Sequence, residues 1–102
     1  MNAMARKSTE AILGAANIAD AVRAELVQRG RRREEILLEW LPDPAIIPPP
    51  EAPELRAELA ECGTVRQMFS REELEVSRDR LDRQSVVAKI NLMVESLHAG
   101  LP

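Results

Sequence analysis

The stretch QRGRRREEILLEWLPDPAIIPPP, residues 28–50, decides how the chain is divided into secondary structure. It places a glycine among arginines, then an apolar segment with the single tryptophan, Trp40, and then a series of prolines. Either one helix runs through the arginines as far as the prolines, or a helix ends at Gly30 and another begins near Arg32. The fold and the role of the arginines both depend on this choice.

The apolar spacing on both sides of the arginines favours a continuous helix. At about 100° per residue, the apolar residues on either side of the arginines fall on one stripe. Its members are Ile12, Ala15, Ala16, Ala19, Val22, Leu26, Val27, Leu37, Trp40 and Leu41. We therefore predict one helix over about residues 8–41, capped by Ser8 or Thr9. A break at Gly30 stays open as the alternative.

A proline-rich connector is expected after this helix. Six of the seven prolines lie between Pro42 and Pro53. Because proline lacks an amide hydrogen and disrupts helices, Pro42 should end the first helix and residues 42–53 should be extended. Ile46 and Ile47 are expected to fix this connector onto the remainder of the protein.

A short helix is predicted next, over about residues 53–62. Proline is favoured in the first turn of a helix and glycine just after its end, which suits Pro53 and Gly63. In such a helix Leu55 and Leu59 would both face inward.

The segment SREE, Ser70–Glu73, is a capping box that begins the last predicted helix. We expect this helix to run over about residues 70–98 and to stop before Gly100 and Pro102.

The last helix has two apolar faces. One stripe contains Val86, Val87, Ile90, Met93, Val94 and Leu97. The other contains Leu74, Leu81, Ala88 and Leu92. A helix that is apolar on two faces needs two neighbours, and a hairpin supplies one. Part of this surface would stay exposed unless another chain covers it, so we predict self-association or a dedicated protein partner.

The composition favours an all-α fold. The only aromatic residues are Trp40 and Phe69, and helix-forming residues predominate outside the prolines. We predict a single helical domain: a long antiparallel helical hairpin with a proline-rich connector and a short middle helix, completed by oligomerisation.

The sequence offers little for catalysis or for metal binding. It has one histidine, one cysteine and no tyrosine, and it lacks a phosphate-binding loop or a nucleophile elbow. Cys62 is expected to be a small buried apolar residue, and His98 a cation at a helix end. Glu95 and His98 have the spacing of helical di-iron sites, but both lie in the last turn, away from the main stripe. We expect no enzymatic activity, no metal and no cofactor.

The first candidate for nucleic-acid binding is the arginine run formed by Arg29, Arg31, Arg32 and Arg33. Glutamates follow the run closely at helical spacing, and the net charge of the chain is −3. We therefore expect an ion-paired, solvent-exposed helix face. Binding of phosphates by these arginines remains the alternative.

The second candidate for nucleic-acid binding is VSRDRLDR, residues 76–83, which resembles the recognition helix of helix-turn-helix regulators. The resemblance implies a small DNA-binding transcriptional regulator that uses Arg78 to Arg83. The sequence departs from the pattern at Glu75, where the usual turn glycine is missing. Asp79 and Asp82 would also face phosphates.

Targeting signals are absent from the sequence as given. No apolar run reaches the length of a membrane span, and the N-terminus lacks a signal-peptide core, whether Met1 or Met4 is the native start. A single cysteine allows no internal disulfide, so a cytoplasmic location is expected. Twelve arginines against two lysines suggest a bacterial source.

These observations favour a non-catalytic protein–protein interaction module, such as an adaptor, a regulator or inhibitor, or a small assembly chaperone. Its partner would be a second copy or another protein. The residues expected at the interface are Trp40, Leu74, Leu81, Ile90, Leu92, Met93 and Leu97, with Trp40 as an aromatic anchor.

Overall fold

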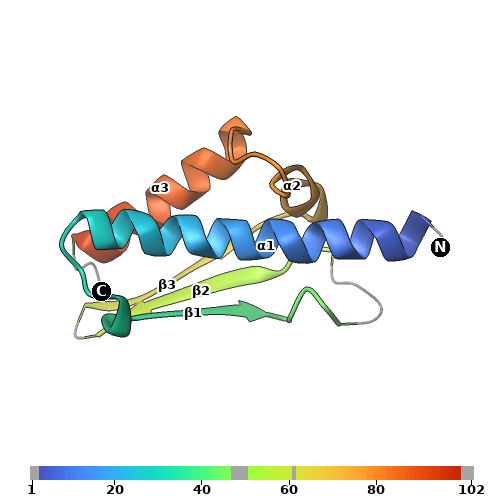
Figure 1. Ribbon diagram of the computed structural model, residues 1–102. Coiled ribbons are helices and arrows are strands. Elements are labelled where there is room, and N and C mark those ends of the chain that lie inside the picture. Colours follow the sequence, from blue (N-terminus) through green and yellow to red (C-terminus); the bar gives the residue numbers. More distant parts are fainter. Residues whose placement is uncertain (1–2, 47–50, 61, 100–102) are drawn as a thin grey trace.

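The computed structural model describes residues 3–46, 51–60 and 62–99. Its elements in chain order are the helix α1 (Ala3–Gln28), the 3-10 turn η1 (Arg33–Glu35), the strands β1 (Ile36–Leu41), β2 (Glu54–Leu59) and β3 (Gly63–Met68), and the helices α2 (Arg71–Val76) and α3 (Gln84–His98). The strands form one antiparallel sheet in the order β1-β2-β3. The helices cover one face of this sheet and leave the other face open (Figure 1). The fold is therefore α+β, and the prediction of an all-α helical bundle is wrong.

The first helix is shorter at its C-terminal end than predicted. It begins at Ala3, so that Ser8 and Thr9 lie inside it, and it ends at Gln28. Gly30 has a φ of 95°, which only glycine adopts easily, and this conformation ends the helix. The alternative of a break at Gly30 is therefore correct, but the α-helix does not restart near Arg32, where only the 3-10 turn η1 precedes β1.

The segment ILLEWL forms the strand β1 where a continuous helix was predicted. Its side chains alternate, so that Ile36, Leu38 and Trp40 face the helices. The intervening side chains are exposed on the open face of the sheet. Five apolar residues among six fit helical spacing and strand spacing equally well, so periodicity cannot distinguish the two.

The segment ELRAEL forms the strand β2 where a short helix was predicted. Leu55 and Leu59 face inward as expected, but Ala57 lies between them on the same buried face. Pairing with both neighbouring strands satisfies the backbone of β2 and overrides the helix propensity of its residues. Gly63 does not cap a helix; it begins β3, with a φ of 128°.

The connector between β1 and β2 contains no regular secondary structure over its described parts, residues 42–46 and 51–53. Its first peptide bond, Leu41–Pro42, is cis. Ile46 is 47% exposed, so it does not fix the connector onto the protein as predicted. Ile47 and the three prolines after it lie outside the described residues.

The capping box of Ser70 and Glu73 is confirmed, but the helix that it begins is short. Ser70 Oγ accepts a hydrogen bond from the Glu73 amide at 3.1 Å, and the Ser70 amide donates to Glu73 Oε1 at 2.8 Å. This helix, α2, ends at Val76, and residues 77–83 connect it to α3. The prediction of one helix over residues 70–98 is therefore wrong. The predicted end at His98 is correct, and Gly100 and Pro102 lie outside the described residues.

One hydrophobic core joins the helices to the sheet. It contains Ala11, Ala15, Ile18, Val22 and Leu26 of α1, Ile36, Leu55, Ala57 and Leu59 of the sheet, Phe69 and Leu74, and Val86, Ile90, Met93, Val94 and Leu97 of α3. The buried stripe of α3 is thus the first of the two stripes in the sequence, except for Val87, which is 36% exposed.

Candidate functional site

A groove between α1 and α3 is the candidate binding site. Its larger part has a volume of about 480 Å³ and is lined by α1 and the connection before α3. Its smaller part, about 240 Å³, lies between α1 and the first turns of α3. Ala21 and Leu81 line both parts, so the two parts adjoin each other. Figure 1 shows that α3 diverges from α1 toward the N-terminus of α3.

The groove has apolar lining residues, which we call its floor, and polar ones, most of which we call its rim. The floor consists of Ala21 and Leu81 in both parts, with Val87 and Ile90 along α3. The rim consists of Asn17, Asp20, Glu25, Asp79, Arg80 and Asn91, and the polar, fully buried Ser77 also lines the larger part. An apolar floor between polar walls suits an amphipathic helix, which buries one face and leaves the other in water.

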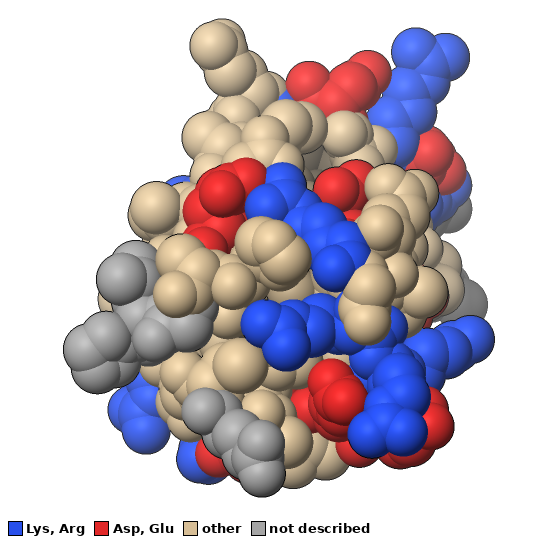
Figure 2. All heavy atoms as spheres, turned by 90° about the vertical axis from the view of Figure 1, so that its left-hand side faces the viewer, with Lys and Arg blue, Asp and Glu red and all other residues tan. Residues whose placement is uncertain are grey.

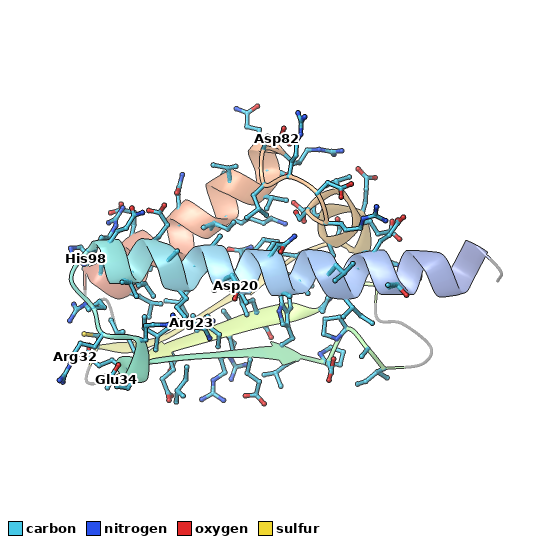
Figure 3. The ribbon with its side chains drawn as sticks, viewed as in Figure 1. Asp20, Arg23, Arg32, Glu34, Asp82 and His98 are labelled. Carbon is cyan, nitrogen blue, oxygen red and sulfur yellow. The ribbon has the colours of Figure 1, made fainter. Side chains whose placement is uncertain are left out.

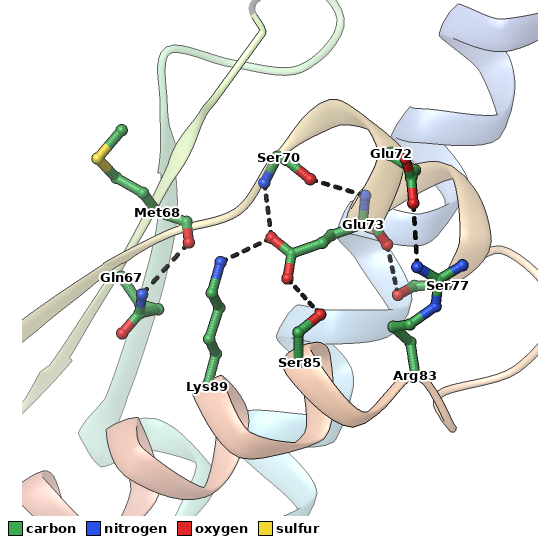
Figure 4. Close-up of polar contacts among 9 residues, drawn as sticks. All are labelled: Gln67, Met68, Ser70, Glu72, Glu73, Ser77, Arg83, Ser85 and Lys89. Carbon is green, nitrogen blue, oxygen red and sulfur yellow. Dashed lines mark hydrogen bonds and ion pairs between the residues drawn. The ribbon is translucent and has the colours of Figure 1, made fainter.

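The angle of α3 is fixed by Glu73, a carboxylate of α2 that is 7% exposed. Besides the capping box, Glu73 accepts hydrogen bonds from Lys89 Nζ at 2.6 Å and from Ser85 Oγ at 2.7 Å (Figure 4). Burial would raise the pKa of Glu73, but these hydrogen bonds outweigh it and hold that pKa below its ordinary value. The charged carboxylate therefore ties the start of α3 to α2.

Gly14 allows α2 to lie directly against α1. A Cβ atom at this position would lie 2.6 Å from the carbonyl carbon of Leu74, and closer still to its oxygen. The two backbones approach so closely that no side chain fits between them. Glycine inside a helix usually costs stability, and this contact explains why one is present.

Hydrogen bonds and an ion pair hold the two ends of the groove. At the end of the larger part, Asn17 Nδ2 donates to the carbonyl oxygens of Ser77 and Arg78 at 2.9 and 2.7 Å. At the end of the smaller part, Arg29 and Glu95 form an ion pair of 2.6 Å. The hydrogen bond within this ion pair raises the pKa of the Arg29 guanidinium and lowers the pKa of the Glu95 carboxyl. The groove is thus a fixed feature of the fold.

The predicted interface residues differ in how far the structure buries them. Leu74, Ile90, Met93 and Leu97 are at most 5% exposed, and they form the core of this single chain. Trp40 is half-buried under α1, where its Nε1 donates to the Ala15 carbonyl oxygen at 3.2 Å and its ring meets Phe69 edge-on. Leu81 lines the groove, and Leu92 is 60% exposed on the outer side of α3.

Sequence reasoning did not find the contribution of α1 to this groove. Ala21 belongs to no predicted stripe, and Asn17 is a poor helix former in the middle of a long helix. A polar residue in the middle of a helix often makes a tertiary hydrogen bond, as Asn17 does here. Its position in the sequence was therefore the available indication that this side of α1 contacts another segment.

The arginine run does not form a basic surface. Arg29 pairs with Glu95, and Arg32 pairs with Glu35 at 3.1 Å. Arg31 is half-buried, whereas Arg33 is exposed beside α1. Figure 2, which views this end of the molecule, shows basic side chains interleaved with acidic ones. The predicted pairing at helical spacing is found only for Arg32 with Glu35, and the predicted helix face is wrong because α1 ends before the arginine run.

The segment that resembles a recognition helix is not helical. Val76 is the last residue of α2, and residues 77–83 form the connection to α3. This connection is also longer than the turn of a helix-turn-helix unit. Its arginines pair with acidic residues, Arg78 with Glu10 and Arg83 with Glu72, each at 3.0 Å.

The residues that could bind a metal ion do not form a cluster in the part of the chain that the structure describes. Over residues 3–46, 51–60 and 62–99, no group of three or more His, Cys, Asp or Glu side chains could hold a metal ion. Glu95 is engaged by Arg29, and His98 is exposed at the end of α3. Cys62 is half-buried as a free thiol.

Comparison with protein-family models, with curated proteins and with solved structures finds no significant match. None of the described helices combines the length and the apolar character that crossing a membrane requires.

Proposed function

We propose that this protein is a non-catalytic protein–protein interaction module whose α1/α3 groove binds an amphipathic helix of a partner protein. The observation that carries the proposal is the groove itself, with an apolar floor at Ala21 and Leu81. A bound helix would complete a layer of three helices and cover Val87, which is 36% exposed.

The rim chemistry indicates which helix would fit. Asp20, Glu25 and Asp79 place carboxylates along the rim, and Arg80 is the basic side chain there. We therefore expect the partner helix to carry small or branched apolar residues on one face and Lys or Arg beside them. A cytoplasmic location is part of the same proposal and rests on the single cysteine.

The test is photo-crosslinking from two positions, performed in the native host. A photoreactive residue at Leu81 lies in the groove, and a control at Thr64 lies on the open face of the sheet. We expect one discrete crosslinked protein from Leu81 and none of that size from Thr64. The partner, once purified, should bind the wild type but lose at least about tenfold in affinity with Ala21→Glu, since the new charge would be buried against its apolar face.

Other outcomes would contradict this proposal. Equal crosslinking from both positions would mean that the groove is not the binding site. DNA binding is the remaining alternative function, and it predicts affinity for a labelled duplex that falls steeply with salt. Such an affinity, together with no protein captured at Leu81, would replace the proposed function.

A further inference from the structure

The backbone of β1 has a free edge. Within the described residues, β1 pairs only with β2. The Ala60 amide donates to the Glu35 carbonyl oxygen at 3.2 Å, so the odd-numbered residues of β1 direct their backbone groups toward β2. Ile36, Leu38 and Trp40 direct theirs away from the sheet. The Ile36 amide bonds within η1, while the described residues provide no backbone partner for Leu38 or Trp40.

This edge lacks the devices that usually protect an edge strand. The segment ILLEWL contains neither proline nor lysine, and its single charge is Glu39. The opposite edge, on β3, carries Arg66, and the Gln67 side chain donates to the outward Met68 carbonyl oxygen at 3.3 Å. An unprotected apolar edge either aggregates or is paired with another strand.

We propose that the β1 edge pairs with the β1 edge of a second copy of this chain, so that the two sheets form one continuous antiparallel sheet around a two-fold axis. In the register that uses the whole strand, Leu38 lies on the axis opposite Leu38 of the second copy, and Ile36 lies opposite Trp40 of the second copy. Leu38 and Trp40 have no backbone partner on this edge among the described residues, and at Ile36 only the amide is engaged, by the Arg33 carbonyl oxygen.

Side-chain charges select this register over its neighbours. With Leu38 on the axis, Leu37 lies opposite Glu39 of the second copy. Moving the axis to Glu39 would place two carboxylates directly opposite each other, which is unfavourable. Moving it to Leu37 would oppose Trp40 with Glu34 of the second copy, and Glu34 lies in η1 rather than in a strand.

The helix above the edge is compatible with this two-fold axis. Asp20 and Arg23 lie on the part of α1 that runs past the middle of β1 (Figure 3), and they line a depression of about 450 Å³ together with Arg33. Asp20 and Arg23 form an ion pair of 3.3 Å within each chain, and because the axis reverses the direction of α1, it would bring the two pairs together in opposite order. Opposite charges therefore meet on both sides of the axis. Ala16 and Ala24 lie on the exposed part of the same helix, and their small size allows close approach.

The test compares two opposite charges at Leu37, which is 61% exposed and contributes little to the core. We expect light scattering to give twice the 11.4 kDa mass of the chain. Leu37→Glu should weaken the dimer by about tenfold or more, because it opposes Glu39 of the second copy at two symmetric places. Leu37→Lys should preserve the dimer, since it gains an opposite charge there. Met68→Glu, at the β3 edge, is the matched control and should have no effect.

A second measurement reports the register directly. In a Cys62→Ser background, Leu38→Cys should form an intermolecular disulfide on mild oxidation, because hydrogen-bonded residues across an antiparallel pair lie about 5.5 Å apart. Thr64→Cys in the same background should not.

Two results would overturn the β1 interface. One is a monomer at every concentration up to the millimolar range. The other is a dimer that Leu37→Glu and Leu37→Lys weaken equally, or that Met68→Glu weakens as strongly. These measurements use the isolated protein and variants outside the groove, so their failure would leave the proposed helix binding unaffected.

Discussion

Replacement of Gly14 by alanine tests the packing of α1 against α2, on which the groove depends. At an exposed helix position, this replacement would stabilise the protein by about 1 kcal/mol, because alanine is the better helix former. In this fold the added Cβ would lie 2.6 Å from the Leu74 carbonyl carbon, whereas ordinary contact begins at 3.4 Å. The two helices must therefore separate by at least the 0.8 Å difference between these values, and further to clear the oxygen.

This separation disturbs a closely packed part of the core. Leu74 is 1% exposed and packs beside Phe69, which is fully buried. Overpacking that moves backbone costs up to about 3 kcal/mol, which exceeds the gain in helix propensity. We expect Gly14→Ala to lower the free energy of unfolding by about 2 kcal/mol and the Tm by roughly 10 °C.

Urea unfolding followed by far-UV circular dichroism and by Trp40 fluorescence measures this change. The matched control is Ala24→Gly, which changes helix propensity at an exposed position of the same helix and should cost about 1 kcal/mol. The sign of the change in the free energy of unfolding of Gly14→Ala shows whether α2 packs against α1 at Gly14. If this variant were more stable than the wild type, α2 would not cross α1 at Gly14, and the account of the groove would be refuted.

Three further predictions concern the anchors of the groove and the two faces of α3. Glu73→Gln should cost about 2 kcal/mol at neutral pH. Because folding lowers the pKa of Glu73, its contribution to stability is fully present above the ordinary pKa of 4.5 and is lost as the pH falls through the folded-state pKa. The difference in the free energy of urea unfolding between wild type and Glu73→Gln should therefore shrink in acid. Asn17→Ala leaves the carbonyl oxygens of Ser77 and Arg78 without their donor, so it should lower the free energy of unfolding by about 1–2 kcal/mol. Thermal unfolding measures this change, and no change would mean that the Asn17 side chain does not make these hydrogen bonds in solution. Leu97→Ala should cost about 2–5 kcal/mol and Leu92→Ala less than about 0.5 kcal/mol, and equal costs would contradict the assigned orientation of α3.

Several local features could be read from the sequence because residues close in the chain determine them. The capping box at Ser70 requires only a turn of backbone, and it forms as predicted. Gly30 ends a helix through its own freedom at positive φ. The buried stripe of α3 follows from helical periodicity and includes Ile90 and Met93 as predicted.

The interface prediction failed to separate core from surface for a related reason. Two apolar stripes on one helix imply two neighbours, but they do not say whether these neighbours belong to the same chain. Within this chain, α2 buries Leu74 against α1, and the sheet covers the first stripe of α3. Leu81 and Leu92 are the predicted residues that remain available.

The sequence by itself determined the start of α2 at its capping box, the end of α3 near His98 and the buried face of α3, because these properties depend on neighbours a few residues away. Only the tertiary structure decided that residues 36–41 and 54–59 are strands. Their apolar residues satisfy helical and alternating spacing alike, and a strand becomes stable only when a distant segment supplies its hydrogen-bond partners. The free β1 edge follows from that pairing, and the groove follows from contacts of α1 with α2 and α3, so neither could be read from local patterns.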